Sequence, residues 1–166
     1  MKQLSMATIE GLANDIQVEL YKLERLAKEI ATVRHLLSTN PEQTGLYYEN
    51  LAFKLHNFYT GCEHIFQMIA DELNGFRSDG FEWHKRLLER MGIAQTGRPA
   101  VLSAHSVAGL REYLAFRHVV RNLYGFELDS TRVHQLVERY PTIWAWVSKD
   151  LHRFLDWHFD LAATFA

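Results

Sequence analysis

Apolar residues recur at intervals of three, four or seven over almost the whole length of this chain. That spacing places them on one face of an α-helix, whereas a half-buried β-strand would alternate apolar and polar residues. No segment alternates in that way, and no internal repeat is present. With 48% hydrophobic residues and only 3 Pro and 9 Gly among 166 residues, the chain can also build a packed core. The sequence therefore predicts an all-α, up-and-down bundle of about five helices in one domain, residues 1–166.

The first two expected helices are long and joined by a short link. Apolar positions over residues 9–37 mark the first helix, and those over residues 51–73 mark the second, which ends at 74–75. Between them, Asn40 is a candidate cap and Pro41 takes a first-turn position of the next helix. Helices of this length with a short link are expected to form an antiparallel hairpin.

Three further helices are expected in the second half of the chain. A short helix follows residues 78–79 and ends at Gly92, and residues 93–99 form a loop. The fourth helix starts near Ser103 or Ser106 and runs to residues 124–125. The fifth starts after residues 129–130, which are candidate caps. In this last helix Pro141 predicts a kink or a break, because proline lacks the backbone donor and clashes with the preceding turn.

Charge and cysteine content limit the classes of function. The formal charge of −2 and the isoelectric point near 6.5 give no general attraction for nucleic acid or for anionic membranes. The lone Cys62 cannot form an intramolecular disulfide, and its place on an apolar stripe predicts a buried, inert thiol. The sequence shows no signal peptide and no apolar run long enough to span a membrane. We therefore expect a cytoplasmic protein that does not contact membranes.

The fourth helix carries an unusual set of polar side chains. At about 100° per residue, Arg117, Arg121 and Tyr124 share one stripe, and His118 and Asn122 share another. The apolar residues of the same segment are expected to face the core; they are Phe116, Val119, Val120 and Leu123.

These residue types suit a phosphodiester substrate. Arginine binds phosphate oxygens through two parallel hydrogen bonds, histidine transfers protons near neutral pH, and tyrosine stacks on bases. The alternative from spacing alone is a solvated helix face on which Arg117 and Arg121 pair with acids such as Glu112.

The segment from Phe116 to Leu128 resembles the signature of the HEPN superfamily, in its HepT-like toxin branch. That signature is an Arg followed by a polar residue, with a His four to six positions further on and a Tyr shortly after it. Arg117, His118 and Tyr124 match the Arg, the polar residue and the Tyr. Asn122 stands where the family has its His, and a carboxamide neither takes up nor gives a proton near neutral pH.

The resemblance implies a HEPN-type helical bundle that acts as a homodimeric, metal-independent ribonuclease without a cofactor, on RNA and above all on tRNA. It implies that Arg117 binds the scissile phosphate with His118 and Asn122 beside it, and that catalysis is crippled unless His118 replaces the missing His. It also implies a minimal nucleotidyltransferase (MNT) antitoxin as partner, which silences the toxin by adding AMP to Tyr124. We add Arg121 to the substrate-binding residues from its position on the stripe alone.

Other sites and other functions are also considered. His152, Asp156 and His158 do not share one helix face, so they are not expected to bind a metal ion. His56 and His64 are aligned on one helix and are interpreted as core-edge or surface residues. Two further functions stay open: a non-catalytic binding module that pairs with a nucleotidyltransferase, and a structural four-helix dimer without a ligand.

Overall fold

The fold is an all-α bundle, as the sequence predicts. The computed structural model describes residues 5–75, 80, 82–124 and 127–164, and within these residues it holds five α-helices and no β-strand. The helices are α1 (Met6–Thr39), α2 (Thr44–Ile69), α3 (Trp83–Met91), α4 (Ala104–Val120) and α5 (Ser130–Ala163). A 3₁₀ turn (Pro41–Gln43) links α1 to α2, and a π-helical turn (Ala70–Asn74) extends α2.

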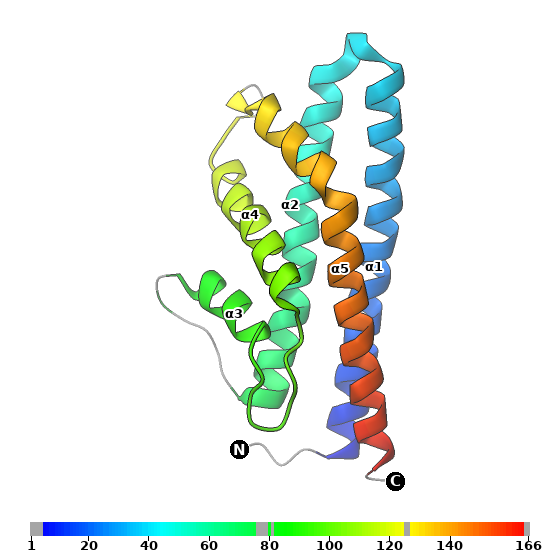
Figure 1. Ribbon diagram of the computed structural model, residues 1–166, viewed down its shortest axis with the longest axis vertical. Coiled ribbons are helices and arrows are strands. Elements are labelled where there is room, and N and C mark those ends of the chain that lie inside the picture. The colour runs from blue at the N-terminus through cyan, green and yellow to red at the C-terminus, as the bar shows by residue number, and fades with distance from the viewer. Residues whose placement is uncertain (1–4, 76–79, 81, 125–126, 165–166) are drawn as a thin grey trace.

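Three long helices form the main body of the molecule. Figure 1 shows α1 and α2 as an antiparallel hairpin, with α5 lying along it and α4 and α3 beside α2. One hydrophobic core draws buried side chains from all five helices, among them Ile16, Leu55, Phe58, Leu88, Leu110 and Leu151. Cys62 lies in this core and its pKa is raised by burial, which confirms the prediction of a buried thiol.

The helix boundaries are partly as expected. α2 and its π-helical turn end at Gly75, whose φ of 59° is the left-handed conformation that favours glycine. Asn40 caps the C-terminus of α1, because its backbone and its carboxamide both donate to the carbonyl of Leu36, and it also precedes the 3₁₀ turn in which Pro41 takes a first-turn position. The expected start of α3 near residues 78–79 lies outside the described residues, and α3 is observed from Trp83.

α4 is fixed to α5 through its N-terminus. Ser103 caps α4, as one of the two predicted starts requires, and its backbone N–H and hydroxyl donate to the Oδ2 atom of Asp150, at 2.7 and 2.8 Å. The hydroxyl of Ser106 donates to the same oxygen at 2.6 Å. Further along, a Cβ on Gly109 would lie 2.4 Å from the side chain of Ile143. The two helices therefore cross so closely that only glycine fits at position 109. These contacts determine where the C-terminal half of α4 lies.

α5 passes through Pro141 without a break. Figure 1 shows its N-terminal part inclined to the rest, so the predicted kink is observed and the break is not. Trp144 and Trp157 pack against the core, whereas Trp146 lies at the surface beside His105. Among the described residues, no helix combines the length and the apolar character needed to cross a bilayer.

The first turns of α1 and the last turns of α5 meet at a buried histidine. The imidazole of His158 lies 2.8 Å through Nε2 from the carbonyl oxygen of Ile9, so Nε2 carries the hydrogen and donates it. Its Nδ1 atom is buried without a hydrogen-bond partner. Burial lowers the pKa of His158 because it removes water from the charged ring, and the hydrogen bond to the carbonyl of Ile9 opposes this shift only in part.

This histidine predicts a loss of stability on mild acidification. Its pKa in the folded chain lies below the unfolded value of about 6.5, so the unfolded chain binds more protons as the pH falls through that value. The free energy of unfolding, measured by urea denaturation, is expected to drop from pH 7.5 to 5.5 and to drop less in His158→Gln. The exposed His152→Gln is the control, and a pH dependence equal in all three proteins would contradict the prediction.

Candidate functional site

Arg117 lies where the C-terminal half of α4 faces α2. Its Nη1 atom donates to the Oε1 atom of Glu63 on α2 at 2.9 Å. The side chain of Glu63 is only 4% exposed, so this ion pair is largely shielded from solvent. The guanidinium carbon also lies 5.9 Å from the centre of the Tyr59 ring, within cation–π range. Arg117 is therefore held in one orientation by a charge and by an aromatic face.

His84 of α3 completes the group. Its Nδ1 atom lies 2.6 Å from the second oxygen of Glu63 and 3.3 Å from Nη1 of Arg117. The ring stacks on Trp83, with centroids 3.6 Å apart. One buried carboxylate thus joins an arginine from α4 to a histidine from α3. We call Glu63, His84 and Arg117 the carboxylate cluster.

A second histidine adjoins the cluster from α2. Burial lowers the pKa of His56, and the positive charges of Arg117 and Arg121 lower it further, against an opposing hydrogen bond from Asn57. Its Nδ1 atom is buried and has no partner. His56 is partly buried, so its interpretation as a core-edge residue is confirmed. The sequence contains no sign that it lies near Arg117 and Arg121.

The other predicted site residues lie at the surface, where α4 ends. His118, Arg121, Asn122 and Tyr124 are all exposed, and Tyr124 is 70% exposed. Among the described residues, no hydrogen bond joins Arg117 to any of these four side chains. The sequence signature therefore places these residues in one neighbourhood, but the contacts of Arg117 come from other helices.

The predicted length of the fourth helix is wrong. α4 ends at Val120, and the backbone N–H groups of Asn122 and Leu123 bond three residues back in tightened turns. The carboxamide of Asn122 donates to the carbonyl of His118 at 3.4 Å, a local bond that competes with helix continuation. Arg121, the C-cap of α4, keeps helical dihedral angles and its backbone N–H donates to the carbonyl of Arg117, so it continues the stripe, whereas Tyr124 lies beyond the helix.

Two further expectations for this segment also fail. Val119 is 55% exposed and Leu123 is also exposed, so the apolar stripe faces the core only through Phe116 and partly through Val120. Glu112 pairs with Arg139 of α5 instead of with the arginines of α4.

Metal binding finds no support in the described residues. No group of three or more His, Cys, Asp or Glu side chains in them could hold a metal ion. His152 bonds the carbonyl of Ser148, and His158 bonds that of Ile9, so the two rings have different roles.

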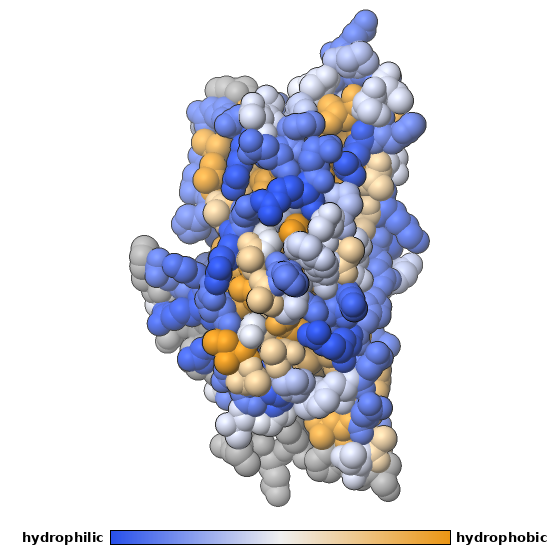
Figure 2. Space-filling view, viewed as in Figure 1, coloured by the Kyte–Doolittle hydropathy of each residue, from blue (hydrophilic) through white to orange (hydrophobic). Residues whose placement is uncertain are grey.

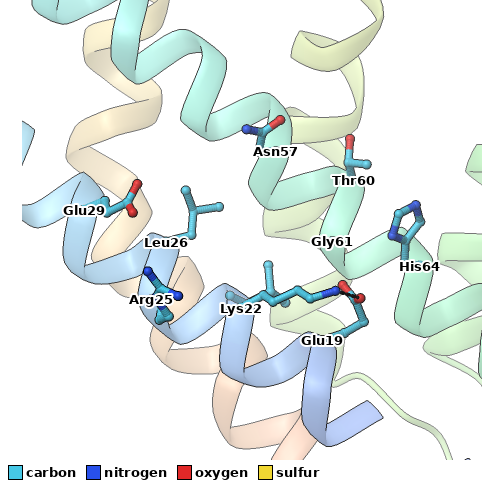
Figure 3. Close-up of a pocket in the computed structure, with 10 residues that line it drawn as sticks. Glu19, Lys22, Arg25, Leu26, Glu29, Asn57, Thr60, Gly61 and His64 are labelled. Atoms are coloured by element: carbon cyan, nitrogen blue, oxygen red, sulfur yellow. Dashed lines mark hydrogen bonds and ion pairs between the residues drawn. The ribbon is translucent and has the colours of Figure 1, made fainter. Parts of the chain in front are cut away.

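A groove between α1 and α2 is the second candidate site. It has a volume of about 470 Å³, and Figure 3 shows Lys22 and Arg25 on one side and Thr60 and His64 on the other. Its charges are largely neutralised: Lys22 pairs with Glu19 at 2.6 Å, and Glu29 on its wall pairs with Lys54 at 2.7 Å. A groove so balanced in charge has no preference for an anionic ligand, so we place the candidate site at Arg117.

Glu63 and His84 were missed from the sequence. Glu63 is an acid inside the apolar second helix, next to Cys62, and an isolated charge in such a stretch is a usable signal for a buried ion pair. No comparable signal marks His84, because its role arises from the packing of α3 against α2.

A double-mutant cycle tests the strength of the buried pair. We expect Glu63→Ala to lower the free energy of unfolding by about 3 kcal/mol, because it leaves Arg117 nearly buried without a counter-charge. The coupling energy between Glu63→Ala and Arg117→Ala should be about 2 kcal/mol. The exposed pair of Glu112 and Arg139 is the matched control and should couple by less than about 1 kcal/mol. Equal coupling in the two pairs would contradict the prediction.

Comparison with known proteins gives a family. A family model described as HepT-like protein matches residues 50–158, a span that includes most of α2, all of α3 and α4, and most of α5. No curated protein and no solved structure matches the chain. Because the family match covers well over half of the sequence, the chain belongs to the family of HepT-like proteins.

Proposed function

We propose that this chain is a ribonuclease toxin that cleaves RNA, above all tRNA, without a metal ion and as a homodimer. The observation that supports the proposal is the fixed orientation of Arg117 by a buried carboxylate, at the edge of a surface that also holds His118, Arg121 and Tyr124. An oriented guanidinium binds phosphate oxygens and stabilises the charge that develops on them during cleavage.

The cluster leaves part of Arg117 available for a phosphate. Glu63 takes the Nη1 atom, and the Nε atom is buried without a partner. The Nη2 atom forms no hydrogen bond within the described part of the chain, and it is the donor that we assign to the scissile phosphate. Arg121 and His118 add positive or hydrogen-bonding groups beside it, and a two-fold axis would double them. This local concentration compensates for the formal charge of −2 of the whole chain.

Asn122 provides the test of the enzymatic proposal. The carboxamide cannot transfer a proton, so Asn122→His is expected to raise the rate of RNA cleavage about 100-fold or more. Arg117→Ala should abolish cleavage, and EDTA should have no effect. The measurement is cleavage of total RNA and of tRNA by the purified full-length chain, resolved on denaturing gels. If Asn122→His leaves all RNA intact, the enzymatic function is wrong.

We also propose that a minimal nucleotidyltransferase antitoxin silences the chain by adding AMP to Tyr124. In support, the side chain of Tyr124 is 70% exposed and lies seven residues after Arg117. Bound AMP would place bulk and a negative phosphate beside the proposed RNA site, and both oppose RNA binding.

The modification predicts a change in mass. With ATP and the nucleotidyltransferase encoded beside this chain, intact-mass spectrometry should show the addition of one or more AMP groups. Tyr124→Phe should remove the addition, whereas Tyr47→Phe, at an exposed end of α2, should not. An unchanged mass of the unmutated chain would contradict the prediction.

A non-catalytic binding module is the second candidate function, and one observation favours it. Exposed Val119 and Leu123 border an apolar hollow of about 160 Å³ between the end of α4 and the start of α5. Figure 2 shows hydrophobic residues at the surface in this region of the molecule. Such a hollow suits a protein partner better than RNA. The same cleavage assay separates the two functions, because a binding module leaves RNA intact even as Asn122→His.

A further inference from the structure

The ring of His84 is held on two sides. Glu63 binds its Nδ1 atom at 2.6 Å, and Trp83 stacks on one face at 3.6 Å between centroids. The side chain remains 21% exposed, although the carboxylate that it contacts is nearly dry. His84 therefore combines a fixed orientation with access to solvent, which is the combination that a proton-transfer group requires.

The contacts also determine which nitrogen carries the hydrogen. A carboxylate oxygen only accepts hydrogen bonds, so a distance of 2.6 Å to Glu63 requires that Nδ1 of His84 is protonated and donates. The Nη1 atom of Arg117, 3.3 Å from the same nitrogen, is also a donor and directs its own hydrogen to Glu63 at 2.9 Å. In the neutral ring, Nε2 consequently keeps its lone pair and can accept a proton.

We propose that His84 is the proton acceptor in the slow RNA cleavage of the unmutated chain, which lacks a histidine at position 122. The proposal rests on the proposed ribonuclease function and adds a catalytic residue to it. Glu63 is a positioning residue: it fixes the tautomer of His84 and stabilises the imidazolium that forms, while it also orients Arg117 for the phosphate.

The cleavage step needs only groups of the chain, the RNA and water. Nε2 of His84 takes the proton of a ribose 2′-hydroxyl while the 2′-oxygen attacks the adjacent phosphorus. The bond from phosphorus to the 5′-oxygen breaks, its electron pair stays on that oxygen, and water supplies the proton that the oxygen needs. The products are a 2′,3′-cyclic phosphate and a 5′-hydroxyl end. The imidazolium then releases its proton to the hydroxide that the water left.

The other two histidines near Arg117 are less suited to this role. His118 is exposed, and within the described residues no carboxylate contacts its ring. His56 has a buried Nδ1 atom without a partner, and it lies close to the charges of Arg117 and Arg121, which oppose protonation. Only His84, of these three, has both a carboxylate on one nitrogen and a side chain that is partly open to solvent.

The experiment measures RNA cleavage by the full-length chain and its variants under single-turnover conditions. His84→Ala is expected to lower the rate about 100-fold or more. His84→Gln keeps a donor for Glu63, so it protects the fold against loss of the ion pair, and it should lower the rate as much because an amide takes up no proton. The control is His152→Gln, an exposed histidine of α5, which should cleave at the unmutated rate.

Added imidazole separates proton transfer from a structural role. It should restore at least about a tenth of the lost rate to His84→Ala by entering the vacated space, and it should restore nothing to Arg117→Ala. Circular dichroism and thermal unfolding of each variant verify the fold.

Three results would overturn the role of His84. They are equal rates for His84→Gln and the unmutated chain, a folded His84→Ala that imidazole does not rescue, and an unmutated chain that is inactive while Asn122→His cleaves RNA. The last result leaves the ribonuclease function standing without His84. If neither the unmutated chain nor Asn122→His cleaves RNA, the ribonuclease function itself is wrong, and the proposal for His84 is wrong with it.

Discussion

The buried charge of Glu63 is the constraint on which the arrangement around Arg117 depends. A carboxylate that is 4% exposed loses most of its hydration, and only partners with opposite charge or good donors offset that loss. Glu63 meets the requirement with Arg117 from α4 and His84 from α3. The two carboxylate oxygens of Glu63 therefore connect α2, α3 and α4. The orientation of the guanidinium follows from this electrostatic need rather than from the polar face of α4.

The sequence predicts the fold well because its periodicity is the physical cause of the fold. Burial of one apolar stripe per helix determines the hairpin of α1 and α2, and the capping chemistry of Ser103 and the conformation of Gly75 determine two of the helix ends. The prediction fails at residues 121–124, where the periodic pattern continues in the sequence but the helix does not. Val119 and Leu123 fit a helical stripe by spacing, yet they are exposed at the end of α4. Periodicity alone cannot detect such an end.

The site was predictable only in part, because its residues come from distant parts of the chain. Arg117 is recognisable from its local signature, whereas Glu63 lies 54 positions and His84 lies 33 positions before it. Spacing along one helix carries no information about such contacts. The same limit explains the pairing of Glu112 with Arg139 of α5, which only the packing of α4 against α5 determines. The pattern along α4 groups residues of that helix alone, whereas the partners that orient Arg117 lie on α2 and α3.

The end of α4 at Val120 has a consequence for any enzyme that acts on Tyr124. A side chain within a packed helix can enter a foreign active site only after the surrounding backbone unwinds, and that opening costs free energy. Tyr124 stands instead four residues beyond the last helical position, in a short connection to α5. Its backbone N–H donates to the side chain of Glu127, and its carbonyl accepts from the backbone N–H of the same residue, so local bonds to Glu127 replace the repeating main-chain bonds of a helix. The tyrosine can therefore be presented to a second protein while Arg117, seven residues earlier, stays locked in the fold.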